Sequence, residues 1–492
     1  MAKMTRQEQE TLLGLITTMG SYGRAEAEPE AGFLTRFLPL PEHARCLHPD
    51  IVLVIGDRGA GKTELFRAIQ TPGGCRLIGE IDARNDIPDL GHADWLVGFS
   101  SSGREFPPEM VFRNFAAGKQ PSDLQVLWLG LLVRSLLSGG VLSGVSGDAG
   151  RVVATVGDPS LKLVDLAQAV SEHMEGIFSV LDGLDKDLSV NDRWVFVTYD
   201  ELDRVSAGDW DAMRTILRGL VQFWASYVRR WRRLRPKLFV RRDLYTRVAL
   251  FGPDVSKIAA QRVELTWTAR NLYALTVKRL VNHDSRMRDY LGRTLPEGEE
   301  RGELGWLPTA RKEADYRPFL ERMCGQFMGA GPNKGQSFTW IPNHLQDGNG
   351  QVLPRSFVRL FECAAEMERA NPQAEPPRLF HHSSLREAVD QVSVSRMQEL
   401  EDEEFPWLKH VKAAVAEAHP QVPMERQELE RLITLDWDNK SEKAPDTSGR
   451  DLLRLLIELG LFYLRADGRV DARDLYMKGF GLKRKGGVKR PY

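Results

Sequence analysis

The sequence has few cysteines, almost no net charge and no long uninterrupted apolar run. Its four cysteines, Cys46, Cys75, Cys324 and Cys363, are widely spaced among 492 residues, without the paired spacing of a zinc site or a redox dithiol. They are typical of free thiols in a reducing compartment. The formal net charge of −1 excludes a global field that would draw the chain onto nucleic acid or anionic lipid, so any such binding must come from local patches.

No stretch of the sequence predicts a membrane span or a secretory signal. The most apolar stretch, Leu124 to Val145, is interrupted by Arg134. Each remaining piece is shorter than the about 20 residues that a span needs. The first residues are polar and lack the apolar core of a signal peptide. We therefore expect a cytoplasmic protein that does not bind a membrane, with two or three domains for its length.

The strongest motif is Gly56-Asp57-Arg58-Gly59-Ala60-Gly61-Lys62-Thr63, which follows an apolar run and precedes a helical pattern. This is the G-x-x-x-x-G-K-[ST] loop of nucleotide-binding proteins in its strand–loop–helix context. Its glycines can adopt backbone angles closed to other residues, so consecutive N–H groups can turn toward a phosphate, and the helix adds its positive N-terminal end. We predict that Lys62 reaches the β and γ phosphates of ATP and that Thr63 ligates Mg²⁺. The predicted nucleotide-binding residues of this segment are Gly56, Asp57, Arg58, Gly59, Ala60, Gly61, Lys62, Thr63 and Glu64.

A second feature is an apolar, β-prone run, Arg193–Tyr199, that ends in Asp200-Glu201-Leu202-Asp203-Arg204. In a P-loop fold, the acid at the end of such a strand lies beside the loop threonine and holds Mg²⁺ through water. We assign that role to Asp200. Glu201 is then placed to act as a general base that orients the attacking water. Asp203 and Arg204 are expected to form an ion pair or a subunit contact.

Arginines surround the next predicted strand, Leu238–Val240. At its end, Arg241 and Arg242 are candidate catalytic residues that sense a γ-phosphate in cis or reach a neighbouring subunit's phosphate, because guanidinium groups match phosphate oxygens. Pairing with Asp243 or another acid is the alternative, and the sequence does not choose. Before the strand, a predicted helix over 209–233 ends in the cluster Arg229–Lys237. This cluster either binds nucleic acid, with Trp231 stacking on a base, or is a solvated helix end.

The remaining segments complete the predicted architecture. Short apolar runs at Arg76–Gly79 and Ala93–Ser100 indicate further buried strands of a parallel sheet. Helical patterns dominate beyond Leu265. One of them carries Arg355 near its start, where it either folds back onto the nucleotide from a second domain or remains a surface arginine. A helix, a hairpin that turns at Asp467-Gly468, and a basic tail (Lys483, Arg484, Lys485, Lys489, Arg490) predict a terminal winged-helix-like module that binds DNA or protein.

The predicted fold class is therefore α/β: a P-loop NTPase with a parallel sheet flanked by helices, then a helical domain and a C-terminal winged-helix-like module. The predicted division is an N-terminal helix and lead-in over 1–45, a P-loop NTPase core over 46–265, a helical lid or sensor domain over 266–425, and the module with its basic tail over 426–492.

With these motifs, the chain resembles the bacterial STAND- and KAP-type P-loop NTPases of the wider AAA+ group. The likeness covers roughly residues 45–365 and rests on Gly56–Thr63, Tyr199–Arg204, Lys237–Asp243, Leu265–Trp267 and Pro354-Arg355. It implies Asp200 for Mg²⁺, Glu201 for water activation, and Arg241 or Arg242 as the sensor. It also implies a regulatory ATPase of anti-phage defence that acts beside an effector such as a nuclease. Two departures are the lack of transmembrane segments between the nucleotide motifs and the lack of a long repeat array.

Three functions are compatible with the sequence. The first is an ATP-hydrolysing switch, expected to be a homo-oligomer, that gates a protein effector encoded nearby. The second is a DNA-engaging motor or loader that uses Arg229–Lys237 or the C-terminal module. The third is a nucleotide-bound scaffold with little turnover. The sequence does not distinguish ATP from GTP or DNA from RNA, and it does not specify the oligomeric state, the trigger or the partner.

Overall fold

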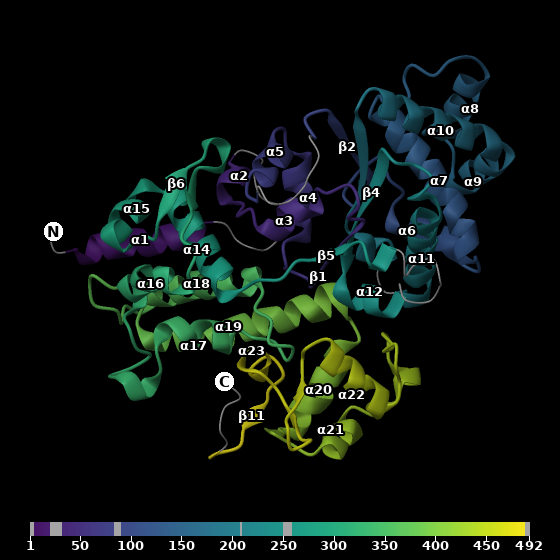
Figure 1. Cartoon of the computed structure of the whole chain (residues 1–492). Helices are drawn as coiled ribbons and strands as arrows, with labels where there is room; N and C mark the ends of the chain where they lie inside the picture. Colours follow the sequence, from purple (N-terminus) through teal and green to yellow (C-terminus); the bar gives the residue numbers. More distant parts are fainter. Residues whose placement is uncertain (1–3, 20–31, 83–89, 207–208, 249–257, 488–492) are drawn as a thin grey trace. The chain divides into compact units, whose positions relative to one another are not determined.

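The computed structural model describes residues 4–19, 32–82, 90–206, 209–248 and 258–487 (Figure 1). The chain divides into two compact units, Pro39–Leu265 and the combination of Met1–Leu38 with Thr266–Tyr492. The described residues before Pro39 thus group with the C-terminal half of the chain, and the predicted division into domains stays a prediction. Lys489 and Arg490 of the predicted basic tail lie outside the described residues.

A parallel sheet forms the centre of the unit Pro39–Leu265. Its strand order is β2 (Ala93–Phe99), β3 (Trp194–Tyr199), β4 (Leu234–Arg241), β1 (Leu53–Gly56) and β5 (Arg262–Glu264). Every neighbouring pair is parallel, so all the carboxyl ends lie at one edge. Helices flank the sheet, and the predicted fold class, an α/β P-loop NTPase sheet flanked by helices and followed by a helical region, is confirmed.

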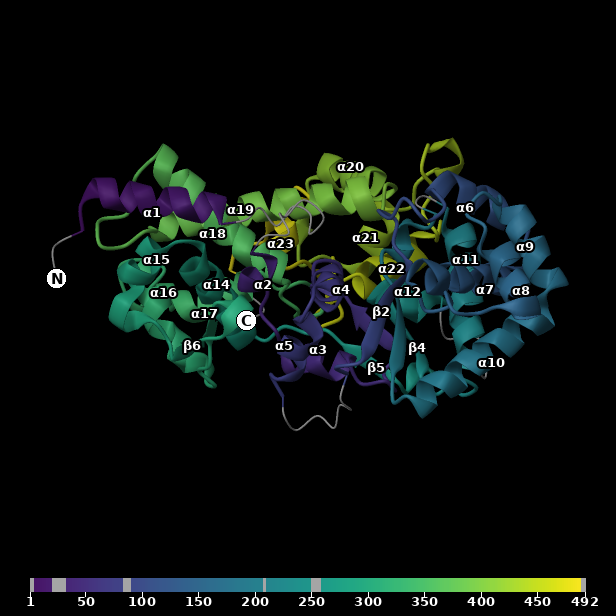
Figure 2. The same cartoon turned by 90° about the horizontal axis from the view of Figure 1, so that it is seen from above.

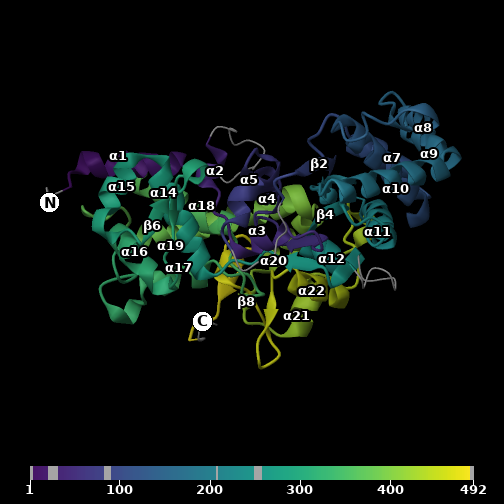
Figure 3. The ribbon, with the colours of Figure 1, turned by 45° about the horizontal axis from the view of Figure 1, so that its top comes forward.

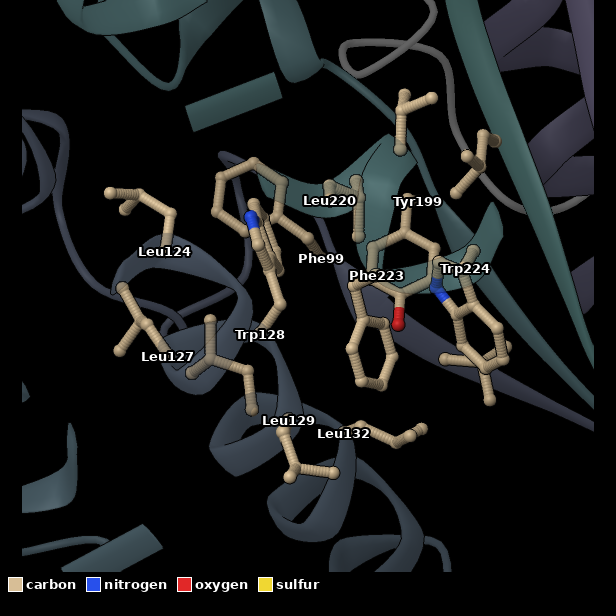
Figure 4. Close-up of a cluster of buried hydrophobic side chains, with 14 of the residues drawn as sticks. Phe99, Leu124, Leu127, Trp128, Leu129, Leu132, Tyr199, Leu220, Phe223 and Trp224 are labelled. Carbon is tan, nitrogen blue, oxygen red and sulfur yellow. The ribbon is translucent and has the colours of Figure 1, made fainter. Parts of the chain in front are cut away.

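Both faces of the sheet are buried, as parallel strands require. On one face, alternate strand residues pack against α7 (Pro121–Ser138) and α11 (Trp210–Tyr227). Figure 4 shows the aromatic centre of this core, where the ring of Trp128 lies 5.9 Å from Phe99 and 5.8 Å from Tyr199. On the other face, Phe239 of β4 packs edge-on against Phe66 of α4 (Lys62–Gln70), with ring centroids 5.8 Å apart. This packing fixes α4, and hence the loop before it, to the sheet.

Between β2 and β3 the chain inserts a group of helices that lie together beside the sheet (Figure 2). These helices are α6 (Glu109–Ala116), α7, α8 (Gly147–Gly157), α9 (Leu163–Glu172) and α10 (Met174–Val190). No helix among the described residues is long and apolar enough to cross a bilayer.

Two elements of this unit differ from the sequence predictions. The run Arg76–Gly79 is part of a helix, α5 (Gly74–Gly79), and not a strand. A short apolar run does not by itself distinguish a strand from a buried helix. The helix predicted over 209–233 ends at Tyr227, because the chain beyond it turns into β4, which begins at Leu234 rather than Leu238.

The second unit is mainly helical. Its central helix, α14 (Ala269–His283), is buried along most of its length. In the same unit, α1 (Arg6–Thr18) packs on α18 (Pro354–Ala370), which also packs on α19 (His382–Glu399).

The shorter elements of the two units are α2 (Phe33–Arg36), α3 (Pro41–Cys46), α12 (Arg242–Val248), α15 (Ser285–Leu291), α16 (Arg317–Cys324), α17 (Ser337–His344), α23 (Asp474–Met477), β6 (Gly298–Glu300), β7 (Trp306–Pro308), β8 (Gln421–Val422) and β11 (Lys483–Arg484).

The C-terminal residues form the helix-and-hairpin arrangement that the sequence predicted (Figure 3). The helices are α20 (Leu408–Ala418), α21 (Arg426–Leu432) and α22 (Gly449–Glu458), and the hairpin pairs β9 (Tyr463–Leu464) with β10 (Val470–Asp471). An antiparallel bridge joins Met424 to Val470, so a segment before residue 426 also belongs to the module.

Lys237 is a cation buried within β4. Its Nζ donates to the carbonyl oxygens of His48 at 2.6 Å and Ile51 at 2.7 Å, and it lies 5.1 Å from the centroid of the Phe196 ring. Burial lowers the pKa of Lys237 to about 7. The folded protein therefore releases this proton at a lower pH than the unfolded chain.

We expect the substitution Lys237→Met to remove part of the pH dependence of folding. The stability that a depressed lysine pKa contributes is complete above the unfolded pKa and is lost as pH falls toward the folded pKa. Between about pH 7 and about pH 10, the free energy of unfolding of the wild type minus that of Lys237→Met should rise by up to about 1.4 kcal/mol per pH unit. Urea titrations over this range measure the difference. Lys186→Met, which replaces an exposed lysine, serves as the control. If the difference in free energy of unfolding between wild type and variant did not change with pH for either variant, the prediction would be contradicted.

Candidate nucleotide site

The P-loop connects β1 to α4 at the carboxyl edge of the sheet. Gly59 and Gly61 adopt left-handed φ angles of 84° and 94°, which favour glycine, and Gly61 caps α4. Gly56 does not adopt a positive φ, so the prediction that its backbone angle requires glycine was wrong. A Cβ at Gly56 would lie 3.1 Å from the Cβ of Ala60, so this position is glycine because the loop folds closely over it.

Lys62 extends back over the loop. Its Nζ donates to the carbonyl oxygens of Gly56 at 2.8 Å and Asp57 at 3.0 Å. Burial lowers the pKa of the ammonium, and the nearby Asp203 and Asp200 act in the opposite direction. The ammonium can exchange these carbonyl partners for phosphate oxygens without leaving the loop. Of the other predicted loop residues, Ala60 is buried, whereas Asp57, Arg58, Gly59, Thr63 and Glu64 are partly exposed.

Thr63 and Asp200 meet at this edge, although they come from different elements. Asp200 directly follows β3 and is 3% exposed. Burial raises the pKa of Asp200 to about 7, and the nearby Thr63 hydroxyl acts in the opposite direction. The second carboxylate oxygen, Oδ2, is buried without a hydrogen-bond partner. A hydroxyl oxygen beside a carboxylate oxygen without a partner fits Mg²⁺, a hard cation that takes oxygen ligands and keeps several waters. Within the described ranges, no group of three or more His, Cys, Asp or Glu side chains could hold a metal ion by itself.

Glu201 is held by a serine loop that the sequence analysis missed. Its Oε2 accepts hydrogen bonds from the hydroxyls of Ser100 at 3.0 Å and Ser101 at 2.7 Å and from the backbone N–H of Ser102 at 3.3 Å. Its Oε1 pairs with Arg204 at 3.1 Å. Glu201 is buried and adopts a left-handed φ of 54°, a strain that non-glycine residues carry mostly at functional sites. The signal for the serines was available, because they directly follow β2, the neighbour of β3 in the parallel sheet.

We expect Ser101→Ala to raise the basal rate of ATP hydrolysis. A carboxylate whose oxygens are both occupied by hydrogen bonds must release a partner before it can accept a proton from water. A hydrogen bond to a charged group is worth about 1.5–3 kcal/mol, so its removal should raise turnover by about tenfold or more. Steady-state phosphate release measures this effect. Ser143→Ala, which removes an exposed hydroxyl, is the control, and a Ser101→Ala turnover at or below the wild-type value would contradict the assigned role of the loop.

The two candidate sensor arginines both pair with acids in this unit. Arg241 is buried and contacts Asp203 at 3.2 Å and Asp243 at 2.9 Å. Arg242 contacts Asp57 of the P-loop at 3.3 Å and Glu264 of β5 at 2.7 Å. The pairing alternative therefore describes the observed state, and the expected ion pair of Asp203 forms with Arg241 rather than with Arg204. The predicted roles in sensing phosphate stay predictions.

Arg355 begins α18 in the other unit. There its guanidinium lies 3.5 Å from Glu399 of α19, and its side chain is 22% exposed. The predicted contact of Arg355 with the nucleotide stays a prediction.

The cluster Arg229–Lys237 does not form the stacking surface of the nucleic-acid alternative. Trp231 is fully buried, and its Nε1 donates to Asp182 of α10 at 3.0 Å, so its ring cannot stack on a base. Lys237 is buried in the sheet. Arg230 forms a two-pronged pair with Asp182, at 2.8 and 2.5 Å. Only part of the cluster is therefore open to a ligand.

The hairpin of the C-terminal module also carries compensated charge. Asp471 is fully buried and pairs with Arg465 at 2.8 Å and with Arg484 at 3.0 Å. Arg469 pairs with Asp467 at 2.7 Å. These arginines stabilise the module, and a phosphate backbone would have to compete with carboxylates for them.

Comparisons with known proteins add little to this description. No family model matches the chain, and no curated protein matches it. Among solved structures, the chain is similar to the Aeropyrum pernix ORC2 protein in its ADPNP–ADP complexes, at 15% identity and a TM-score of 0.39, over 91% of this chain and 94% of that chain. It is also similar to Cdc6p from Pyrobaculum aerophilum, at 11% identity and a TM-score of 0.27, over 87% and 86%. Likenesses at these scores carry no argument about activity, so the site must be argued from its own residues.

Proposed function

We propose that this chain is a Mg²⁺-dependent ATPase of the AAA+ group whose nucleotide binds at the carboxyl edge of the sheet. The observation that carries the proposal is the pairing of the Thr63 hydroxyl with the buried Asp200, whose second oxygen lacks a partner. These residues come from β1–α4 and from the end of β3, and β4 lies between the two strands. A P-loop opposite an acidic strand end is the arrangement that phosphoryl transfer needs.

In this proposal, each residue has a separate task. The backbone N–H groups of the loop and the Lys62 ammonium bind the β and γ phosphates. Thr63 and Asp200 hold Mg²⁺, which supplies charge that neutralises the phosphate oxygens. Glu201 breaks its hydrogen bond to at least one of the serines, orients the attacking water and accepts its proton.

We further propose that hydrolysis serves as a regulatory switch in a homo-oligomer that gates an effector protein, as the resemblance to STAND- and KAP-type NTPases implies. Arg242 supports this proposal, because it pairs with Asp57 in the P-loop itself and would respond to a phosphate bound there. Arg242 reaching a neighbouring subunit's phosphate would require this pair to open. The paired arginines of the C-terminal hairpin favour protein docking over DNA binding by that module. A role in anti-phage defence rests on the resemblance alone.

The experiment that tests the switch is a native mass measurement of the full chain with and without ATP and Mg²⁺. A change of oligomeric state on addition of ATP, absent with ADP, supports the switch. An unchanged mass together with slow turnover supports a nucleotide-bound scaffold. Turnover that is stimulated by DNA supports the motor or loader.

A further inference from the structure

The strongest feature outside the nucleotide site is a pocket at the opposite edge of the same sheet. It has a volume of about 450 Å³, and its lining includes Arg229, Arg232, Arg233, Arg235, Asp50 and Trp194. We call it the arginine pocket. Trp194 and Leu234 begin β3 and β4, so the pocket lies at the amino ends of the strands. β4 is eight residues long, and the pocket is therefore separated from the P-loop edge by about 23 Å at ~3.3 Å per residue.

The backbone that presents these arginines is held in place by a single buried carboxylate. Asp185 of α10 accepts hydrogen bonds from the backbone N–H groups of Arg232 at 3.0 Å, Arg233 at 2.6 Å and Leu234 at 3.1 Å. Three donors on one carboxylate keep this turn in one conformation. The side chains of Arg232 and Arg233 therefore leave the chain from fixed positions, and a ligand would not have to order this part of the pocket.

Two of the arginines are also fixed as side chains. Arg233 lies over the Trp194 ring, with its guanidinium carbon 4.3 Å from the ring centroid, and pairs with Asp192 at 2.8 Å. Arg235 pairs with Asp50 at 3.2 Å, and its side chain is 14% exposed. Its Nε is buried without a hydrogen-bond partner. Its Nη1 donates to the carbonyl oxygen of Val228 at 2.5 Å, so the Arg235 guanidinium is held in one orientation at the pocket wall.

The other two arginines have no compensating acid. Arg229 and Arg232 are exposed and form no ion pair with the part of the chain that the structure describes. Burial lowers the pKa of Arg235, and the positive charge of Arg232 acts in the same direction. The negative charges of Asp50 and Asp185 act in the opposite direction. Arg233 pairs with Asp192 and Arg235 pairs with Asp50. The two remaining arginines leave a formal excess of two positive charges on the pocket wall. This excess of like charge in a hollow favours an anion.

We propose that the arginine pocket is a second phosphate-binding site, remote from the P-loop. Guanidinium groups bind phosphate oxygens in pairs and with defined geometry. The Arg233 guanidinium already occupies one face of the Trp194 ring. The groups that the pocket offers to a ligand are mainly guanidinium groups, which match phosphate oxygens rather than a particular base. The phosphate comes either from the backbone of a nucleic acid or from a free polyphosphate.

The test uses the double variant Arg229→Gln/Arg232→Gln, because neither side chain forms an ion pair with any of the described residues. The matched control is Arg76→Gln/Arg151→Gln, which removes the same charge from two exposed positions on α5 and α8 of the same unit. Thermal unfolding of both variants checks that the fold is kept. This test is independent of ATP hydrolysis, because both probes below are measured in the Lys62→Ala background, where the P-loop no longer competes.

The first probe is a fluorescein-labelled DNA duplex, measured by anisotropy at a series of salt concentrations. If backbone phosphates occupy the pocket, the double variant should bind the duplex at least about tenfold more weakly than the control. The negative slope of log affinity against log salt concentration should also become shallower by about two. The second probe is tripolyphosphate, measured by calorimetry. If free polyphosphate occupies the pocket, binding should be lost in the double variant and kept in the control. Either result supports the site. Equal binding of both probes by the double variant and the control would overturn it.

Discussion

Replacing Lys62 with alanine is expected to weaken ATP binding at the P-loop strongly. The ammonium already lies over the loop, held by the carbonyl oxygens of Gly56 and Asp57, so it makes its contacts with the β and γ phosphates at little cost in ordering. Each hydrogen bond between charged groups is worth about 1.5–3 kcal/mol. The loss of two such bonds predicts ATP affinity weaker by at least about 100-fold.

Isothermal titration with a non-hydrolysable ATP analogue and Mg²⁺ measures this change. The matched control is Lys186→Ala, which removes an exposed lysine of α10 and should leave affinity unchanged. If Lys62→Ala bound the analogue as tightly as the control, the loop would not be the phosphate site, and the proposed function would fail.

The substitution Glu201→Gln is expected to stop hydrolysis and spare binding. Glutamine keeps the length of the side chain and can still accept hydrogen bonds from Ser100 and Ser101 through its amide oxygen, but it cannot accept a proton from water. General-base catalysis contributes typically about 10²–10⁴-fold to a rate. We therefore expect turnover to fall at least about 100-fold, with the affinity for ATP changed only a few fold.

Single-turnover phosphate release together with the binding titration separates the two effects. Glu172→Gln, an exposed residue near the end of α9, is the control for the loss of one carboxylate. Unchanged turnover in Glu201→Gln would show that Glu201 is not the general base for hydrolysis. Loss of binding as well as turnover would show that Glu201 acts on the structure of the site.

Much of the proposed nucleotide site could be located from the sequence because its signals are local. A glycine-rich loop after an apolar strand encodes the phosphate cradle within a few residues, and the acids after β3 are adjacent in sequence. The serine loop that holds Glu201 was missed, because Ser100–Ser102 and Glu201 become neighbours only through the pairing of β2 with β3. Gly56 was assigned the right position for the wrong reason, because the closeness of Ala60 depends on how the loop closes.

For the basic cluster Arg229–Lys237, the sequence alone could not show which side chains are exposed. Its charge pattern in the sequence left two alternatives open, nucleic-acid binding with Trp231 stacking on a base or a solvated helix end. In the folded chain, Asp182 and Asp185 of α10 bind this segment from a helix that precedes β3. Asp182 pairs with Arg230 and Trp231, whereas Asp185 binds only backbone N–H groups. Which arginines remain uncompensated is thus decided by a helix inserted elsewhere in the chain.

Residue type and short spacing were enough to indicate the chemistry that we propose: a loop for a triphosphate, an oxygen pair for a divalent cation and a carboxylate for water. These features are local, and the chain holds them whether or not it is folded. The folded chain was needed to establish which charges are already neutralised, which arginines remain open to a ligand and which groups hold Glu201, because electrostatic and hydrogen-bond partners are set by proximity in space rather than along the chain.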